Sequence, residues 1–397
     1  MQYRSDPKSG NALSILGFGC MRFPRNLSQI DMNKTEKLVL KAIENGVNYF
    51  DTAYIYGGSE EALGTIVHKN NVRDRIFIAT KLPHAKCQRY EDFDALFKTQ
   101  LERLRTDYID YYLIHNLSDT KSWQRLRELG IEKWIADNKA SGKIRQIGFS
   151  FHGMYDEFLS LLDAYDWDFC QIQYNYVNTH YQAGTAGLQK AAEKGIPVMI
   201  MEPLLGGKLA NGLPQKAINQ FKAANTALSP AAWAFRWLWD QREVFVVLSG
   251  MNDDAQLSEN LELADRSVSG MLSDEEHRLF ESVTEAFRAS YKIPCTGCNY
   301  CMPCPQGINI PACFSAYNMS YTVGFLSGLQ QYITSTGASN PNANHSPGHC
   351  IKCGKCEKHC PQHIQIRASL TAVTKRMEPF WFNPAMKLFV RVREKSK

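Results

Sequence analysis

The chain has 397 residues, of which 44% are hydrophobic, 21% are charged and 11% are aromatic. This composition is typical of a folded globular protein with a full-sized core and excludes intrinsic disorder as the main state. The formal net charge of +5 hides two unlike regions, because residues 1–290 carry a net charge of −4 (33 basic and 37 acidic side chains) and residues 291–397 a net charge of +9 (12 basic and 3 acidic). We therefore expect two domains that meet near residue 290.

Eight short apolar runs recur along residues 1–290, and segments with helical spacing or helix caps separate them. These candidate strands are residues 14–19, 47–50, 76–80, 109–114, 144–149, 169–173, 197–201 and 244–248. Ser273 and Glu276 fit a capping box at the start of a late helix. Eight strand–helix repeats are the pattern of a (β/α)8 TIM barrel, an α/β fold. Since no G-x-G-x-x-G motif follows an early strand, a doubly wound sheet with a Rossmann phosphate loop is the weaker alternative.

Four ionisable residues follow three consecutive candidate strands. Asp51 and Tyr56 come after the second strand, Lys81 after the third and His115 after the fourth. Because chemistry in a (β/α)8 barrel belongs to the loops at the carboxyl ends of the strands, we expect these side chains to meet at one rim. A lysine held by an aspartate stabilises a tyrosinate, so that Tyr56 gives a proton to an oxyanion while His115 orients the carbonyl. Each residue alone also fits a structural role, and the prediction of a catalytic group depends on their joint position.

The same region resembles the aldo-keto reductase family over about residues 1–290. The resemblance rests on residues 17–22 (GFGCMR), 51–57 (DTAYIYG), 113–115 (LIH) and 147–150 (IGFS), and on the family's Asp, Tyr, Lys and His tetrad, present in order. It implies a barrel that binds an extended nicotinamide cofactor without a Rossmann fold and reduces a carbonyl by hydride transfer, with the tyrosine as proton donor. By motif, it assigns cofactor contacts to Asp51, Ser150, Gln171, Leu204 and Asn260.

Two positions depart from the pattern of that family. Met201 stands where the family usually places a tyrosine against the nicotinamide ring. Residues 249–252 and Gln256 supply no cation where the family usually places a lysine and an arginine for the 2′-phosphate of NADP. A cation at the 2′-phosphate is the main electrostatic feature that distinguishes an NADP(H) site from an NAD(H) site. The sequence therefore leaves open which of the two cofactors binds. We count Met201 and Gln256 among the predicted cofactor contacts.

Eight of the 12 cysteines form two runs after residue 290. The runs are Cys295, Cys298, Cys301 and Cys304, and then Cys350, Cys353, Cys356 and Cys360. The second run, followed by Pro361, matches the bacterial 4Fe-4S pattern in full, and the first has one residue fewer before its last cysteine. In that pattern three thiolates bind one cluster and the fourth serves the other. The predicted sets are Cys295, Cys298, Cys301 and Cys360 for one cluster, and Cys350, Cys353, Cys356 and Cys304 for the other. The short spacing before Cys304 leaves Cys313 as its alternative.

Zinc is the alternative interpretation of these cysteines, but zinc sites prefer two separated pairs in a closed tetrahedron. Disulfides are disfavoured because residues 1–10 are polar and no signal peptide is recognised, so we expect a cytoplasmic protein with reduced thiols. No apolar stretch has the length of a membrane span. We expect neither a membrane nor a nucleic-acid partner.

The segment between the two runs, residues 305–349, is too long for a small ferredoxin. Its mixed helical spacing predicts a helical insertion, similar to the helical ferredoxin domains of electron-transfer subunits. Residues 293–351 contain no Asp, Glu, Lys or Arg, which fits either internal packing or an apolar docking face. The predicted second domain, residues 291–397, is therefore a mostly helical ferredoxin-type domain.

Hydride transfer moves two electrons whereas a 4Fe-4S cluster passes one, and a flavin can exchange electrons with both. The two predicted domains therefore leave three functional hypotheses. The first is an oxidoreductase that interconverts a small carbonyl and its alcohol with a nicotinamide cofactor, accompanied by two 4Fe-4S clusters. The second is a reductase fed by a ferredoxin or another redox partner, with a flavin near Met201. The third is a redox sensor or binding protein with structural clusters. The complete tetrad favours the first.

Overall fold

Eight parallel strands form one closed barrel in the order β3-β6-β7-β8-β9-β10-β11-β12. The strands are β3 (Leu16–Gly19), β6 (Tyr49–Asp51), β7 (Phe77–Leu82), β8 (Ile109–Ile114), β9 (Ile144–Phe151), β10 (Phe169–Gln173), β11 (Val198–Met201) and β12 (Val244–Ser249). Each predicted strand overlaps one of these, so the predicted (β/α)8 fold is confirmed. The computed structural model describes residues 1–27, 29–336, 345–382 and 384.

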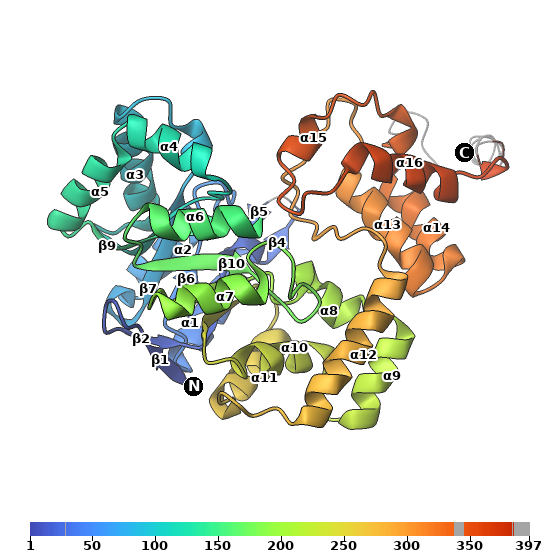
Figure 1. Cartoon of the computed structure of the whole chain (residues 1–397), viewed down its shortest axis with the longest axis horizontal. Coiled ribbons are helices and arrows are strands. Elements are labelled where there is room, and N and C mark those ends of the chain that lie inside the picture. The colour runs from blue at the N-terminus through green and yellow to red at the C-terminus, as the bar shows by residue number, and fades with distance from the viewer. Residues whose placement is uncertain (28, 337–344, 383, 385–397) are drawn as a thin grey trace. The chain divides into compact units, whose positions relative to one another are not determined.

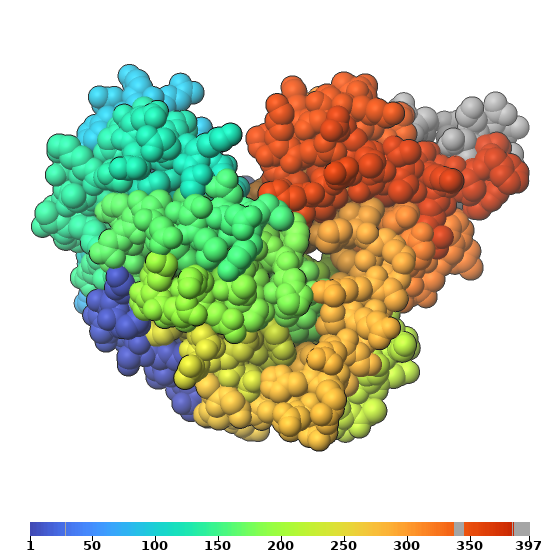
Figure 2. Space-filling view, in the orientation of Figure 1, coloured from blue at the N-terminus to red at the C-terminus, as the bar shows by residue number. Residues whose placement is uncertain are grey.

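The described residues fall into two compact units. We call Met1–Pro203 with Ala232–Leu272 the barrel unit, and Leu204–Ala231 with the described part of Ser273–Lys397 the cysteine-rich unit. The barrel unit contains α1 (Met32–Glu44), α2 (Ser59–Lys69), α3 (Glu91–Leu104), α4 (Thr120–Glu128), α5 (Ile131–Ala140), α6 (Tyr155–Ala164), α7 (Gly184–Glu193), most of α10 (Pro230–Trp239) and α11 (Asp254–Arg266). Figure 1 shows β10 between α6 and α7, and the space-filling view shows their side chains closing over this buried strand (Figure 2).

The interior of the barrel is packed with side chains from its strands. Tyr49 of β6 meets Tyr111 of β8 edge-on, with ring centroids 5.2 Å apart, and Val246 of β12 belongs to the same buried cluster. Gly17 of β3 leaves room for them, because a Cβ atom at this position would lie 2.7 Å from Val246 Cγ1. Since the interior is filled, the chemistry of this unit belongs to the ends of its strands.

Two short antiparallel strand pairs in the barrel unit were not predicted. They are β1 (Tyr3–Ser5) with β2 (Ala12–Ser14), and β4 (Arg25–Asn26) with β5 (Gln29–Ile30). Strands of two or three residues are too short to show an alternating hydrophobic pattern. Both pairs lie outside the barrel sheet and leave its topology unchanged.

The regular secondary structure in the described part of the cysteine-rich unit is helical, and within residues 291–397 this agrees with the prediction of a mostly helical domain. It contains α8 (Lys208–Asn211), α9 (Gln215–Ala224), α12 (Asp274–Ser290), α13 (Ile310–Thr322), α14 (Phe325–Thr336), α15 (Lys355–Lys358) and α16 (Ile366–Met377). The capping box of Ser273 and Glu276 opens α12, and α12 packs against α9 through Phe280 and Phe221, with ring centroids 5.8 Å apart. Residues 337–344 of the predicted insertion lie outside the described residues.

A second core holds the region of the cysteine runs together. Phe314 of α13, Tyr332 of α14 and Leu370 of α16 are buried in one apolar cluster, and cysteines of both runs pack against it. The charge-free stretch therefore contributes to internal packing, one of the two alternatives that the sequence left open. No described helix combines the length and apolar character that crossing a membrane requires.

Candidate functional sites

Asp51 and Lys81 form a buried ion pair at the ends of adjacent strands β6 and β7. Lys81 Nζ donates to Asp51 Oδ1 and Oδ2, both at 2.6 Å, and to the carbonyl oxygen of Thr52 at 2.7 Å. These three acceptors match the three donors of an ammonium group. The side chains are only 1% and 5% exposed. Burial raises the pKa of Asp51, and the neighbouring Lys81 opposes that rise.

The rings of Tyr56 and His115 lie next to this pair. Lys81 Nζ is 5.1 Å from the centroid of the Tyr56 ring, and the Tyr56 and His115 rings meet edge-on with centroids 5.9 Å apart. Burial, followed by the charge of Lys81 and by His152 and His84, holds the pKa of His115 well below its usual value. The structure thus brings all four predicted tetrad residues together, with a neutral histidine beside the tyrosine.

The backbone of Lys81 takes part in a polar network that the sequence did not predict. Buried Glu60 of α2 accepts hydrogen bonds from Thr80 Oγ1 at 2.6 Å and from Gln100 Nε2 at 2.7 Å. Gln100 Nε2 also donates to the carbonyl oxygen of Lys81 at 3.1 Å, and Arg103 forms an ion pair with Glu60 at 3.2 Å. The network ties β7 to α2 and α3. Its members lie on β7, α2 and α3, far apart along the chain, so nothing in the local sequence marks them as a group.

Three predicted cofactor residues lie on the neighbouring strands β9, β10 and β11. Ser150 Oγ accepts a hydrogen bond from the backbone N–H of Asn116 at 2.8 Å. Gln171 is 1% exposed and its Nε2 lies 3.5 Å from Met201 Sδ. Among the described residues, Gln171 Oε1 has no hydrogen-bond donor. A buried acceptor without a donor fits a site that a ligand amide completes.

The other predicted cofactor residues differ in their surroundings. Asn260 of α11 is buried and donates from Nδ2 to Ser249 Oγ at 3.1 Å. Gln256 is exposed, and its Oε1 accepts from the backbone N–H of Asn252 at 3.2 Å. Leu204 is partly buried and belongs to the cysteine-rich unit.

A cation that the sequence analysis missed lies beside the loop after β12. A Cβ atom added to Gly250 would be 3.1 Å from both Cβ and Cδ of Arg22. Arg22 follows β3, which pairs with β12 in the barrel. Arg22 lies far from residues 249–256 along the chain, so no local motif contains both. The predicted strand order nevertheless places the loop after the first barrel strand beside the loop after the last.

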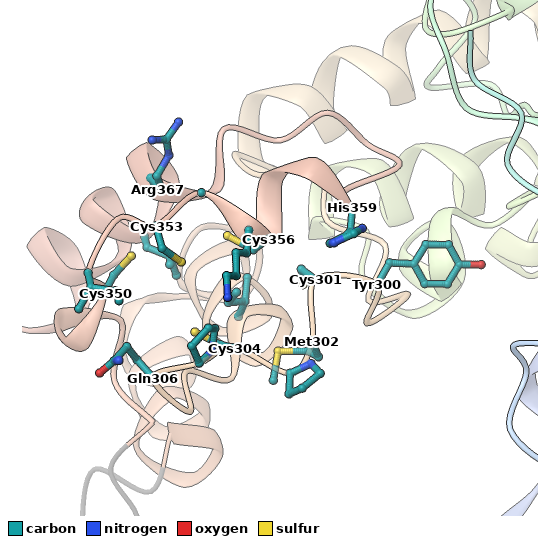
Figure 3. A pocket seen from close by; sticks show the side chains of 17 residues that line it. Tyr300, Cys301, Met302, Cys304, Gln306, Cys350, Cys353, Cys356, His359 and Arg367 are labelled. Atoms are coloured by element: carbon teal, nitrogen blue, oxygen red, sulfur yellow. The ribbon is translucent and has the colours of Figure 1, made fainter. Parts of the chain in front are cut away.

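Each predicted set of four cysteines lines one cavity of the cysteine-rich unit. Cys304, Cys350, Cys353 and Cys356 surround a cavity of about 200 Å³, with Cys301 also in its wall. Figure 3 shows these four side chains gathered around one space, while Tyr300 points away from it. The other four, Cys295, Cys298, Cys301 and Cys360, line a cavity of about 20 Å³ with an apolar wall. Cys313 is fully buried in the apolar core, and the described lining of neither cavity includes it.

Burial disfavours the thiolate form of Cys295 and Cys301 as long as no metal is bound. Burial, and then the neighbouring cysteines, raise the pKa of Cys301 to about 12. Burial is also the main reason that the pKa of Cys295 rises to about 11. Because a coordinated thiol is deprotonated by the metal itself, these cysteines fit a cationic cluster, which compensates their charge. Among the described residues, no three His, Cys, Asp or Glu side chains are grouped tightly enough to bind a single metal ion.

Comparison with protein families gives two matches. The model described as "Aldo/keto reductase family" matches residues 15–285, and the model described as "4Fe-4S dicluster domain" matches residues 294–365.

Individual relatives are also similar to this chain. An aldo-keto reductase of Mycolicibacterium vanbaalenii is 30% identical over 264 residues, which cover 64% of this chain and 84% of the relative. A glyoxal reductase of Bacillus subtilis is 30% identical over 239 residues, which cover 60% and 80% of the two chains.

Solved structures share the fold. An aldo-keto reductase from Klebsiella pneumoniae in complex with NADPH superimposes with a TM-score of 0.58 at 22% identity, covering 72% of this chain and 96% of the other. The holo form of an aldo-keto reductase from Bacillus halodurans gives 0.57 at 22% identity, covering 71% and 96%.

Proposed function

Because the chain belongs to the aldo/keto reductase family, we propose that it interconverts a small carbonyl compound and its alcohol with a nicotinamide cofactor. The observation that carries this proposal is the buried Asp51–Lys81 ion pair beside the rings of Tyr56 and His115. A tyrosine has an ordinary pKa near 10 and needs such help to exchange a proton at neutral pH. Residues 1–290 would form the reductase domain.

In the carbonyl-to-alcohol direction, the hydride for the carbonyl carbon would come from a reduced nicotinamide bound by the residues predicted to contact the cofactor. The hydroxyl of Tyr56 donates its proton to the oxygen that becomes negatively charged. The charge of Lys81 stabilises the tyrosinate that remains, and Asp51 fixes the ammonium group. His115 is neutral, so one of its ring nitrogens has a proton to donate to the carbonyl oxygen. Tyr56 then regains its proton from water.

The residues at the strand ends fit a nicotinamide dinucleotide. The buried acceptor Gln171 Oε1 suits the N–H of a carboxamide, and Met201 Sδ lies next to the same side chain. We propose cofactor contacts for the full predicted set, which is Asp51, Ser150, Gln171, Met201, Leu204, Gln256 and Asn260. In (β/α)8 barrels, phosphates often bind at the loops after the seventh and eighth strands, and Arg22 beside Gly250 gives that region a cation. Either NAD(H) or NADP(H) suits this set.

The cysteine-rich unit supports a second part of the proposal, two 4Fe-4S clusters. One is bound by Cys295, Cys298, Cys301 and Cys360, and the other by Cys304, Cys350, Cys353 and Cys356. The match to a dicluster domain and the two cavities lined by these sets support the assignment. Such clusters pass single electrons. Because they require reduced thiols during assembly, we propose a cytoplasmic location.

A second candidate function is that of a reductase fed with electrons by a redox partner such as a ferredoxin. The exposure of Cys353, one of the predicted cluster ligands, favours this candidate. In that case a flavin would have to join one-electron and two-electron chemistry.

An anaerobic preparation of the full chain tests these proposals. Iron, sulfide, flavin and bound nucleotide are measured, and oxidation of NADH and NADPH is then followed with a panel of small aldehydes and ketones. We expect two clusters for each chain, no flavin and carbonyl-dependent oxidation of one nicotinamide. Bound flavin together with turnover that needs a reduced ferredoxin would overturn the first function in favour of the second.

A further inference from the structure

The two cysteine runs differ in the residues between their cysteines. Thr, Gly, Asn, Tyr, Met and Pro separate the cysteines of residues 295–304, and none of these carries a charge. In residues 350–358 every third residue is a cysteine, and a lysine stands two positions after each, at Lys352, Lys355 and Lys358. The positive charge of this region is therefore concentrated around one of the two predicted clusters.

These lysines lie on the surface. Lys352, Lys355 and Lys358 are exposed, and so is Cys353 between them. Ile351, next to Lys352, is 61% exposed and adds an apolar side chain to the same segment. None of the three lysines forms an ion pair with a residue that the structure describes. Their charge is thus available to a partner in solution.

The acidic residue of this segment, Glu357, does not neutralise the charge of the three lysines. Both oxygens of Glu357 are held by Arg367, with Nε–Oε2 2.8 Å, Nη2–Oε2 2.7 Å and the backbone N–H of Arg367 2.9 Å from Oε1. Glu357 and Arg367 therefore neutralise each other, and the segment keeps a net positive charge.

The other predicted cluster site has a different environment. Ile310, Phe314, Ile364 and Ile366 contribute to the wall of the smaller cavity, which has no charged residue among its described lining. Cys353 is the exposed member of the eight predicted ligands, and the remaining seven are partly buried. Transfer of an electron from another protein requires close approach to a cluster, and the exposed Cys353, with exposed lysines at positions 352 and 355, offers such an approach.

We propose that Lys352, Lys355 and Lys358, with Ile351, form the docking surface for an acidic one-electron carrier protein. The proposal rests on the proposed presence of a cluster held by Cys304, Cys350, Cys353 and Cys356, which would be the first to be reduced. The step moves one electron from the carrier, which is oxidised, to that cluster, and no bond forms or breaks. Opposite charges steer the two proteins together at a rate that falls with ionic strength.

Binding tests the surface without depending on enzyme turnover. The variant K352Q/K355Q/K358Q is compared with K216Q/K222Q/K375Q, which removes three exposed lysines elsewhere in the same unit. The probe is an oxidised, strongly acidic ferredoxin, titrated calorimetrically into the holoprotein at low and at high salt. We expect the first variant to bind about tenfold more weakly than wild type at low salt. The second variant should bind like wild type, and the difference should vanish at high salt.

The rate of electron transfer shows whether the lysine substitutions weaken docking or change the reduction potential of the cluster. The same ferredoxin, reduced, is mixed with each variant in a stopped-flow instrument, and bleaching of the cluster absorbance is followed. In parallel, photoreduced deazaflavin serves as a small uncharged reductant. K352Q/K355Q/K358Q should be slow with the ferredoxin and normal with deazaflavin. Equal binding by the two variants, or slow reduction with both reductants, would overturn the docking surface.

Cluster content distinguishes this result from failure of the proposed function. If both variants and the wild type lack iron and sulfide, the proposed clusters are wrong, and the docking surface with them. If the clusters are present and the two lysine variants behave alike, the docking surface alone is wrong. Binding of the wild type to phosphatidylserine vesicles but not to the ferredoxin would also overturn it.

Discussion

The two units of this chain differ in how far their chemistry is complete in the protein itself. In the barrel unit, Lys81 already has three acceptors, and Tyr56 and His115 lie beside it. In the cysteine-rich unit, buried thiols such as Cys301 have a raised pKa and line cavities that protein atoms do not fill. The catalytic group proposed for the barrel unit is therefore already assembled from its own side chains, whereas the clusters proposed for the cysteine-rich unit also need iron and sulfide.

The largest expected effect comes from removing the Tyr56 hydroxyl, which we propose as the proton donor. Tyr56→Phe keeps the ring against His115 but has no proton to give, so kcat for carbonyl reduction should fall by about 10²–10⁴-fold. Steady-state kinetics measure this, and the iron content should stay at the wild-type level. Unchanged turnover would remove Tyr56 from the mechanism.

Breaking the buried ion pair should be the next largest effect. Lys81→Met leaves Asp51 buried without its partner, which should lower the free energy of unfolding of the barrel unit by about 3–5 kcal/mol. Denaturant unfolding followed by tryptophan fluorescence measures the loss. Lys133→Met breaks the exposed pair with Asp137 and should leave the free energy of unfolding close to the wild-type value. Similar losses in the two variants would show that the Asp51–Lys81 pair has no special role in stability.

The neutral state of His115 has a consequence for stability at acidic pH. Since its pKa is lowered in the folded protein, the unfolded chain binds more protons than the folded chain once the pH falls below about 6.5. This residue should therefore cost up to about 1.4 kcal/mol of stability for each pH unit below that value. His115→Asn should flatten the decline between neutral and acidic pH, and the exposed His68→Asn should not. An identical decline in both variants would contradict the buried neutral histidine.

The smallest of these effects concerns which cysteines bind metal. Cys360→Ser removes one of eight predicted ligands, so iron per chain should fall to about half as one cluster is lost. Cys313→Ser should retain all of the iron. If Cys313→Ser lost iron and Cys304→Ser did not, Cys313 and not Cys304 would be the fourth ligand of the cluster.

Periodicity and motif spacing accounted for much of the fold. Eight apolar runs located the barrel strands because a strand buried on both faces has few polar residues. The tetrad was predictable because strand ends meet at one rim, a rule that needs no side-chain detail. The hairpin of β1 and β2 was missed because three-residue strands have no measurable period.

Contacts between distant segments were beyond sequence reasoning. The Glu60 network depends on how α2 and α3 pack against β7, and Arg22 reaches Gly250 only because β3 closes the barrel on β12. Cysteine spacing, in contrast, sufficed to propose that three cysteines of one run and the last cysteine of the other run bind the same cluster. Three closely spaced cysteines can contact one cluster, and the fourth cysteine of that run lies too far along the chain to join them. The same spacing revealed nothing of the exposure of Cys353, which depends on the fold.

The most direct test of the account is the fate of a deuterium label on the hydride-bearing carbon of the reduced nicotinamide. The full anaerobic chain is turned over with a carbonyl substrate, and the alcohol is analysed by mass spectrometry. Direct hydride transfer at the tetrad predicts that the deuterium appears on the former carbonyl carbon. Loss of the label to solvent, or product formation only when a reduced electron carrier is added, would contradict the account.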